Sequence, residues 1–306
     1  MQYSTVFPRI ALVVAILFGT IGVVAGPAAA APEARFPGGL ASNYVETDLA
    51  KFHYVRAGSG TPVVLIAGGG LWGYSWRDVL PALAAEHTVY AVDLPSQGYT
   101  EARRADFAYD LPAMSAAIAS FLDAVGLART TLVGHSWGGA WSMYFAQEHP
   151  DRVERLVLLD APGLDAEKAP VTPLFTTPLL GELATELTTR SFYAENIRAT
   201  FAHPRLVTDE IVDAYYLPFA RPANRAGFLA LWRNLDYRVT DAGLHRITAP
   251  TLVLWGGADT WLPATQAGAL AARIPDATAH VLPGCGHALH EDCPALAVPL
   301  LSDFLR

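Results

Sequence analysis

The sequence is poor in charge, and most of its charge is negative. Only 16% of the 306 residues are charged, and 21 lysines and arginines against 29 acidic residues give a formal net charge of −8. No basic run appears, which argues against nucleic acid as a partner, because binding a phosphate backbone relies on clustered Lys and Arg. With 52% hydrophobic residues, the chain can bury a large core. The length suits one large domain with an inserted cap.

Cysteine is rare as well, with only Cys285 and Cys293 in the chain. The sequence leaves open whether a disulfide closes this short loop or both thiols stay unpaired. His287 and His290 lie between them, so four metal-capable residues fall within nine positions. Four zinc ligands that close together, leading into a helix, would be cramped. We therefore expect no metal ion at this segment.

Long apolar runs are missing except at the start of the chain. Arg9 precedes an apolar run over residues 10–24, and the small residues 28–31 follow Gly26 and Pro27. This pattern predicts a signal peptide over residues 1–31, cleaved near Ala30 or Ala31, and hence a secreted or periplasmic protein. The alternative is an uncleaved anchor, because residues 10–31 are just long enough to span a bilayer. We expect no stable membrane span in the mature protein.

Strand-like and helix-like patterns alternate after this leader. Residues 44–55 suit two antiparallel strands. A continuous apolar run, typical of a strand buried on both faces, occupies residues 62–66, and further strand patterns occupy residues 88–92, 130–133, 153–159, 250–255 and 278–282. Helical spacing occupies residues 76–86, 111–125, 140–149, 263–274 and 294–305. The sequence predicts an α/β fold, a doubly wound and mostly parallel sheet with its site at the carboxyl ends of the strands.

Residues 163–245 interrupt this alternation. They contain helix patterns at 179–189, 191–200, 208–217 and 223–235, broken by Pro218 and Pro222. We therefore predict a helical cap over residues 163–245, inserted into a core of residues 32–162 and 246–306. The predicted cap is rich in large apolar side chains, namely Phe192, Tyr193, Tyr215, Tyr216, Phe219, Phe228 and Trp232. They indicate a hydrophobic substrate, and packing of the cap on the core is the alternative explanation.

The chain is organised around the segment Gly134-His135-Ser136-Trp137-Gly138-Gly139. An apolar strand pattern precedes it and a helix pattern follows, which is the context of a Gly-x-Ser-x-Gly nucleophile elbow. A serine on so sharp a turn has a strained backbone and crowded flanks, where Gly134 and Gly138 leave room. Ser136 is therefore the predicted nucleophile.

A serine hydroxyl needs a general base, and the base needs an orienting group. In this fold the acid and then the base follow the serine along the chain. Asp259 follows the strand pattern at 250–255, and His287 lies between two glycines after the pattern at 278–282. Asp160 is the alternative acid and His290 is the alternative base.

The oxyanion formed during acyl transfer needs two backbone N–H donors. The amide of Trp137, directly after the nucleophile, is the first candidate. The second comes from the glycine turn after the strand pattern at 62–66, where we choose Gly69 and take Gly70 as the neighbouring alternative. Three glycines after a buried strand suit a close approach of backbone to ligand.

Together these stretches resemble the α/β-hydrolase superfamily, in its capped esterase, epoxide hydrolase and peptidase-like branch, over nearly everything after residue 42. The resemblance rests on residues 65–70, 75–77, 93–98, 134–139, 255–259 and 284–287. It implies a Ser-His-Asp triad without metal or organic cofactor. Two positions depart from the pattern. Ala67 replaces a usual histidine, and Ser136 stands where epoxide hydrolases and haloalkane dehalogenases carry aspartate.

The leading hypothesis is an exported serine hydrolase that cleaves an ester or related acyl bond of a small, hydrophobic molecule. One alternative is an aminopeptidase of the proline iminopeptidase type. It would need carboxylates for a substrate ammonium, and the predicted cap offers Glu182, Glu186, Glu195, Asp209, Glu210 and Asp213. A carbon–carbon bond hydrolase or perhydrolase would use the same triad, and a non-catalytic small-molecule binding protein is the reading outside enzymes. The sequence does not define an oligomeric state.

Overall fold

The computed structural model describes residues 36–165 and 172–306, so the predicted signal peptide lies outside the described residues. A nine-stranded sheet runs through the described part, in the order β1-β2-β4-β3-β6-β7-β8-β9, with β5 paired to β2. The strands are β1 (Ser42–Glu46), β2 (Ala50–Ala57), β3 (Thr61–Ile66), β4 (His87–Val92), β5 (Glu101–Ala102), β6 (Thr130–His135), β7 (Val153–Leu159), β8 (Thr251–Gly256) and β9 (Ala277–Leu282).

The sheet is antiparallel at one edge and parallel elsewhere. β2 pairs antiparallel with β1, β4 and β5, whereas the strands from β4 to β9 in the sheet order pair in parallel. Every residue of β4, β6 and β8 is buried, as expected for strands covered on both faces. The predicted doubly wound, mostly parallel sheet is confirmed.

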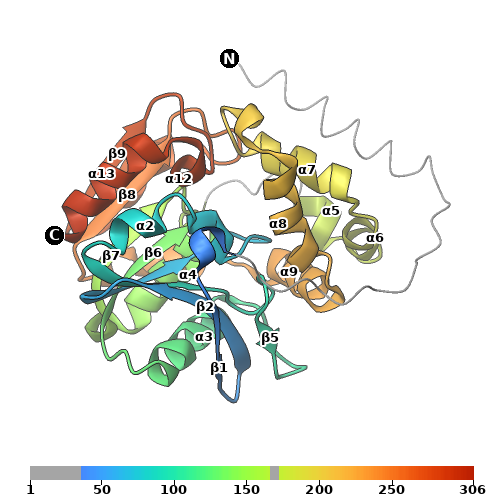
Figure 1. Ribbon diagram of the computed structural model, residues 1–306, viewed down its shortest axis with the longest axis horizontal. Coiled ribbons are helices and arrows are strands. Elements are labelled where there is room, and N and C mark those ends of the chain that lie inside the picture. Colours follow the sequence, from blue (N-terminus) through green and yellow to red (C-terminus); the bar gives the residue numbers. More distant parts are fainter. Residues whose placement is uncertain (1–35, 166–171) are drawn as a thin grey trace.

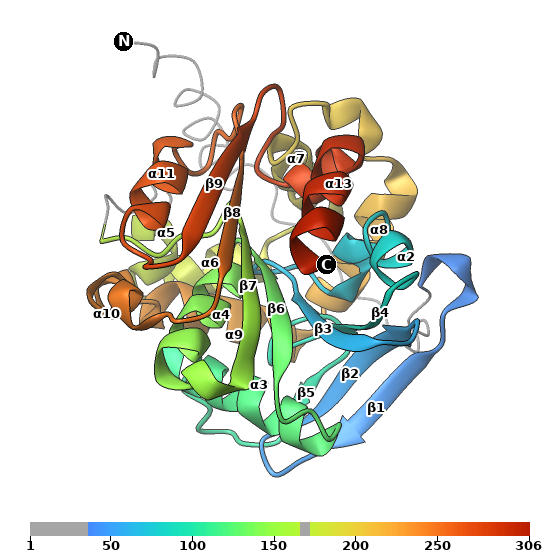
Figure 2. The same ribbon diagram turned by 90° about the vertical axis from the view of Figure 1, so that its left-hand side faces the viewer.

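Helices cover both faces of the sheet (Figure 2). One apolar cluster joins the sheet to α3 (Leu111–Ala124), α4 (Trp137–Glu148) and α11 (Thr265–Ala271), and a second joins its other face to α2 (Leu80–Leu83) and α13 (Pro294–Leu305). The short elements of the core are η1 (Pro37–Gly39), η2 (Gly73–Trp76), η3 (Pro150–Arg152) and α12 (Leu289–Asp292). No helix among the described residues is long and apolar enough to cross a bilayer.

Two local predictions were wrong. The helix expected at 76–86 is divided into η2 and α2, and Pro81 lies in the first turn of α2. Proline has no N–H for an intrahelical bond, so it starts a helix more readily than it continues one. Conversely, Pro218 does not break its helix, because it sits near the end of α8 (Asp209–Phe219). Pro222 opens the next helix, α9 (Pro222–Asn234).

The described residues between β7 and β8 form helices and no strand, and most of these helices lie to one side of the core in Figure 1. Besides α8 and α9 these are α5 (Thr172–Thr176), α6 (Leu180–Glu186), α7 (Arg190–Ala199), η4 (Pro204–Leu206), α10 (Tyr237–Gly243) and η5 (Leu244–Arg246). α10 and η5 differ from the others because they pack against α4 of the core. The side chain of Gln147 on α4 donates to the carbonyl of Thr240 on α10 at 2.8 Å.

Candidate functional site

Ser136 occupies a tight turn between β6 and α4, with φ at +50°. Its amide donates to the carbonyl of Leu159 at 2.9 Å, which fixes the turn against β7. A Cβ added to Gly134 would lie 2.5 Å from the carbonyl oxygen of Gly138, and one added to Gly138 would lie 2.3 Å from that of Ile66. Only glycine fits at these two flanking positions.

The structure brings the predicted nucleophile, base and acid into one line of hydrogen bonds. Nε2 of His287 lies 3.0 Å from Oγ of Ser136, and its Nδ1 lies 2.8 Å from Oδ2 of Asp259. The other carboxylate oxygen of Asp259 accepts from the amides of Trp261 at 2.7 Å and Leu262 at 3.0 Å. With three donors on Asp259, this carboxylate is oriented as the partner of His287.

The two rival residues lie nearby in other roles. His290 is fully buried, its ring packs on Trp76 with centroids 4.5 Å apart, and neither ring nitrogen has a hydrogen-bond partner among the described residues. Asp160 is also fully buried at the end of β7 and accepts the amide of Gly256 at 2.7 Å. Neither makes the hydrogen bond to Ser136 or to His287 that the alternative assignment requires.

His135 makes a hydrogen bond to the backbone of His287, the predicted base. Nε2 of His135 lies 2.9 Å from the carbonyl oxygen of His287, so this nitrogen carries the proton. Burial, together with the neighbouring His287, lowers the pKa of His135 to about 3. Burial also lowers the pKa of His290 well below its usual value. Both side chains therefore stay neutral near pH 7, and His287 is the member of this group that can exchange a proton with Ser136.

The loop that carries His287 is tied to the cap. The buried carboxylate of Asp292 accepts the amides of Gly286 at 2.8 Å and Ala202 at 3.0 Å, the second of which comes from the cap. Glu291, also buried, pairs with Arg77 and accepts the hydroxyl of Tyr215 on α8 at 2.6 Å. These contacts join the helical segment between β7 and β8 to the loop of the predicted base.

Cys285 and Cys293 form a disulfide, which closes the same loop. It decides the question that the sequence left open. It also removes two of the four metal-capable side chains, because both sulfurs are bonded to each other. His203 and Asp292 lie close to Cys293, but they form an ion pair of 2.9 Å instead of a complete ligand set.

The predicted oxyanion donors, Gly69 and Trp137, line the same cavity as Ser136. The indole of Trp137 lies against Gly69, where an added Cβ would come within 2.0 Å of a ring carbon. Gly70 has φ at +74°, a conformation that favours glycine. The glycines of this turn therefore let the backbone pass between the indole and the cavity.

A side chain that the sequence analysis did not single out holds this turn. Nε2 of Gln97 donates to the carbonyl oxygens of Ala67 at 2.9 Å and Gly68 at 2.8 Å, and its Oε1 accepts the amide of Leu94 at 3.0 Å. The only available signal was its place in the segment 93–98, which carries part of the family resemblance.

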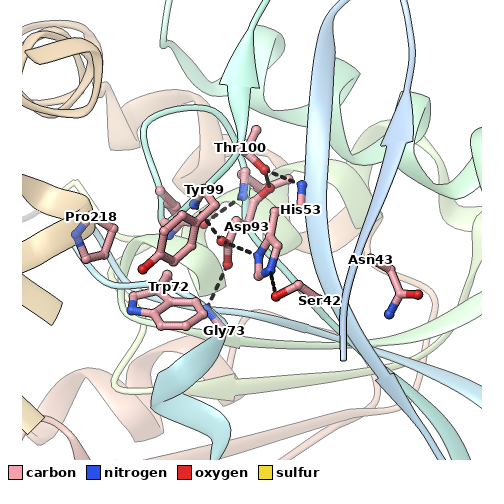
Figure 3. A network of polar contacts seen from close by, with 12 residues as sticks. Ser42, Asn43, His53, Trp72, Gly73, Asp93, Tyr99, Thr100 and Pro218 are labelled. Atoms are coloured by element: carbon pink, nitrogen blue, oxygen red, sulfur yellow. Dashed lines mark hydrogen bonds and ion pairs between the residues drawn. The ribbon is translucent and has the colours of Figure 1, made fainter. Parts of the chain in front are cut away.

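A second row of serine, histidine and aspartate lies beyond this turn (Figure 3). Nδ1 of His53 lies 2.8 Å from Oδ2 of Asp93, and Nε2 lies 2.9 Å from Oγ of Ser42. Asp93 also accepts the amides of Gly73 at 2.8 Å and Tyr99 at 3.0 Å. His53 is fully buried and Ser42 sits within the regular strand β1, so we assign this row to structure. It anchors the loop that follows the glycine turn.

The cavity at Ser136 has a volume of about 850 Å³. Aromatic rings form much of its wall, in a chain of contacts that starts at Trp137. Its ring centroid lies 5.6 Å from that of Phe228 and 5.0 Å from that of Trp232, and Trp232 stacks on Phe175 at 5.0 Å. The predicted hydrophobic cap side chains thus include several that line the cavity.

Both arginines that line the cavity among the described residues are paired with carboxylates. The arginines among its described lining residues are Arg233, which binds Glu182 through two hydrogen bonds of 2.8 and 2.9 Å, and Arg238, which pairs with Asp236 at 2.6 Å. None of the six carboxylates proposed for a substrate ammonium is among the described residues lining the cavity. Five of them pair with arginines instead, namely Glu182, Glu186, Glu195, Asp209 and Asp213.

Comparison with known proteins gives consistent matches over most of the chain. The family model described as alpha/beta hydrolase fold matches residues 61–294. The chain is 30% identical to a 2-hydroxy-6-oxo-6-phenylhexa-2,4-dienoate hydrolase of Burkholderia cepacia, over 78% of this chain and 85% of that protein. It is 32% identical to a 2-hydroxy-6-oxo-2,4-heptadienoate hydrolase of Pseudomonas putida, over 81% and 90%. The crystal structure of Cfl2 from Burkholderia cenocepacia superimposes with a TM-score of 0.76 at 28% identity, covering 87% of this chain and 95% of that one.

Proposed function

The chain belongs to the alpha/beta hydrolase fold family and is a hydrolase, and we propose that it is an exported serine hydrolase that cleaves an ester or related acyl bond of a small hydrophobic molecule. The observation that carries this proposal is the line of hydrogen bonds from Ser136 through His287 to Asp259. A serine, a base within hydrogen-bond reach and an orienting carboxylate are the parts that acyl transfer by a serine nucleophile requires.

The reaction follows from these distances. Ser136 Oγ attacks the substrate carbonyl carbon while its proton passes to Nε2 of His287, 3.0 Å away. The carbonyl oxygen becomes an oxyanion, to which the amides of Gly69 and Trp137 donate. Collapse of this tetrahedral species breaks the bond to the leaving group, which takes the proton from His287. Water, deprotonated by the same nitrogen, then attacks the acyl ester, and Ser136 recovers its proton as the acid is released.

Asp259 keeps His287 in the tautomer that this sequence needs. Its carboxylate accepts from Nδ1, so Nε2 is free to take the serine proton, and its negative charge favours the imidazolium that forms. The neutral state of His135 next to Ser136 supports the proposal, because it places no competing positive charge beside the base.

The cavity supports a hydrophobic and uncharged substrate. Its wall is largely aromatic, and both arginines among its described lining residues already pair with carboxylates. A substrate carboxylate would have to displace one of these partners. An alkyl or aryl ester loses little on leaving water and gains apolar contact area.

Hydrolysis of a carbon–carbon bond is the second candidate, favoured by the relatives. The Burkholderia and Pseudomonas proteins are named as hydrolases of 2-hydroxy-6-oxo-dienoates, at 30% and 32% identity. The names denote carboxylates, and the paired state of Arg233 and Arg238 is why we place this reaction second. Epoxide opening is disfavoured, because Ser136 lacks the carboxylate that would form an alkyl ester.

Export is part of the proposal and rests on residues 1–31, outside the described residues. The Cys285–Cys293 disulfide supports it, since disulfides persist in oxidising compartments. Mass measurement of the protein recovered from a culture supernatant or periplasmic fraction tests it. A chain that begins near residue 31 or 32 is expected, and a full-length chain retained in the cytoplasm would refute export.

A fluorophosphonate probe and a substrate panel test the chemistry. The probe should label the wild type and the Ser142→Ala variant, which loses another hydroxyl of α4, but not Ser136→Ala. The panel compares nitrophenyl esters of alkyl and aryl acids, a prolyl anilide and 2-hydroxy-6-oxo-6-phenylhexa-2,4-dienoate. Ester cleavage that falls at least about 10³-fold in Ser136→Ala is expected. Cleavage of the dienoate alone would establish the second candidate, and equal labelling of both serine variants would overturn the nucleophile.

A further inference from the structure

Asp160 links the carboxyl end of β7 to the carboxyl end of β8 by hydrogen bonds. It follows β7 directly, with φ at +44°, and its amide donates to the carbonyl of Leu254 on β8 at 3.0 Å. Its Oδ1 accepts the amide of Gly256, the last residue of β8, at 2.7 Å. Asp259 lies three residues farther along. Asp160 is therefore held by the same strand end that presents Asp259 to His287.

The carboxyl group of Asp160 lies close to Asp259 and His287. Oδ2 is buried and has no hydrogen-bond donor among the described residues. One carboxyl oxygen of Asp160, one of Asp259 and a ring nitrogen of His287 all lie within 4.8 Å of one another. Two buried carboxyl groups this close do not both carry a charge at neutral pH, because their repulsion in a low dielectric keeps one of them protonated.

The surrounding hydrogen bonds decide which carboxyl holds the proton. Asp259 faces His287 and accepts two backbone amides, all of which favour its charged form. The side chain of Asp160 accepts the amide of Gly256 and faces that of Leu289, so it has fewer donors around it than Asp259. Burial and the charge of Asp259 raise the pKa of Asp160 well above the usual value for a carboxyl. The proton therefore belongs on Asp160.

We propose that Asp160 is a positioning residue: a neutral carboxylic acid whose O–H donates to the carboxylate of Asp259 and holds it, charged, against His287. The inference rests on the Ser136–His287–Asp259 relay of the proposed function. With Asp160 protonated, the two neighbouring carboxyl groups beside His287 carry one negative charge instead of two, and that charge is on Asp259. Asp160 also supplies Asp259 with a fourth donor, beside His287 and the amides of Trp261 and Leu262.

Two variants of the full-length mature protein separate this role from a general structural one. Asp160→Asn is the matched control, because its amide can still accept from Gly256 and donate to Asp259, and it is neutral. Asp160→Leu keeps the volume but removes the donor. Thermal unfolding of both variants shows whether each is folded at the assay temperature.

The catalytic rate should depend on whether residue 160 can donate a hydrogen bond to Asp259. For the ester that the wild type prefers, we expect Asp160→Asn to keep kcat/KM within about threefold and to leave the midpoint of the acid limb of its pH profile in place. Asp160→Leu should lose at least about 30-fold, mainly in kcat. If Asp160 were ionised, the Asn variant would remove a negative charge beside His287 and move the midpoint about one pH unit lower. That shift, or full activity of a folded Leu variant, would overturn the proposal.

A spectroscopic readout does not depend on turnover. The infrared spectrum of the wild type at pH 7 should contain a carboxylic-acid C=O band that is missing from Asp160→Asn. Identical carboxylic-acid regions would show that Asp160 is ionised, and the proposal would fail even if Ser136→Ala confirmed the serine chemistry. Presence of the band with no Ser136-dependent turnover would instead leave the protonated Asp160 standing and refute the proposed function.

Discussion

Gln97 fixes Gly68 by a hydrogen bond of 2.8 Å from its side-chain amide to the glycine carbonyl oxygen. The same nitrogen also donates to the carbonyl of Ala67 at 2.9 Å, so two successive peptide units of the turn before Gly69 are held from one side. Ala67 stands where the resemblance leads one to expect histidine. In this chain the turn is therefore held by a side chain from the loop after β4, and Gln97 is buried together with it.

Replacement of Gln97 should weaken transition-state stabilisation more than substrate binding. In Gln97→Met the side chain keeps its length but loses both donors, so the amide of Gly69 is less well aimed at the oxyanion. Removing one oxyanion donor outright costs roughly 10²–10³ in kcat, and misplacing one should cost about 10-fold or more. Steady-state kinetics should show a lower kcat with KM changed by less than about threefold. An effect confined to KM would contradict the assignment.

Trp261 should matter for the environment of His287. Its indole lies nearly parallel to the imidazole, with ring centroids 6.1 Å apart and planes 21° apart, and it lines the cavity. Trp261→Ala exposes the hydrogen bond between His287 and Asp259 to water and removes part of the wall. We expect kcat/KM for the preferred ester to fall about 10-fold. Trp261→Phe retains a ring and should lose less than about threefold. Equal losses in both variants would show that the indole N–H, and not the ring face, is what matters.

The disulfide should contribute to both stability and activity. It closes a loop with a sequence separation of 8 that contains His287. A loop of this length predicts a loss of about 2–3 kcal/mol in the free energy of unfolding for the Cys285→Ala/Cys293→Ala double variant. Urea unfolding measures it, with thiol-treated wild type as the matched comparison. Unchanged stability in both samples would mean that the cap contacts alone hold the loop.

Acid should destabilise the protein through its buried histidines. Burial holds the pKa of His290 well below that of an unfolded-state histidine, about 6.5. As the pH falls below 6.5, the unfolded chain takes up a proton that the folded chain does not, so the stabilisation present above pH 6.5 is lost progressively. His290→Leu removes this difference. Between pH 7 and pH 5 the variant should therefore lose about 2 kcal/mol less unfolding free energy than the wild type.

Urea titrations at the two pH values measure this change, with His245→Asn as control, because His245 is exposed. Asp160 and Glu291, whose pKa values burial raises, act in the opposite direction. They are the same in all three proteins, so their effect cancels in the comparison. Parallel pH dependences of His290→Leu and the wild type would refute the assignment.

The sequence identified those parts of the site that depend on chain order. Ser136, Asp259 and His287 each follow a strand of the parallel part of the sheet, where the carboxyl ends of the strands meet at one edge, so their proximity was predictable. The role of Gln97 was not, because it depends on where a loop side chain points across two strands. The burial of Asp160 between Gly256 and Asp259 was equally hidden, since a strand-ending aspartate has the same local pattern whether it faces water or a second carboxyl.

Helix boundaries show the same limit. α3 lies within one residue of the helix predicted at 111–125. Asp110 accepts the amide of Ala113 at its start, and Gly126 has a positive φ after its last turn. α10 was not predicted as a separate element, because its packing against α4 is a tertiary contact that leaves no signature in the periodicity of residues 237–243. Strands written as continuous apolar runs were the most predictable part.

The placement of α10 separates the helices of residues 172–234 from the connection between β7 and β8. The chain passes from β7 through the helices α5–α9 and then through α10 to β8, and α10 packs on α4 of the core. If residues 172–234 were absent, a helix that packs on the core, α10, would still lie between β7 and β8. Residues 172–234 can therefore vary in sequence and length with little effect on the sheet. We expect changes in this segment to alter the wall of the cavity, while the strand ends that carry Ser136, Asp259 and His287 stay in place.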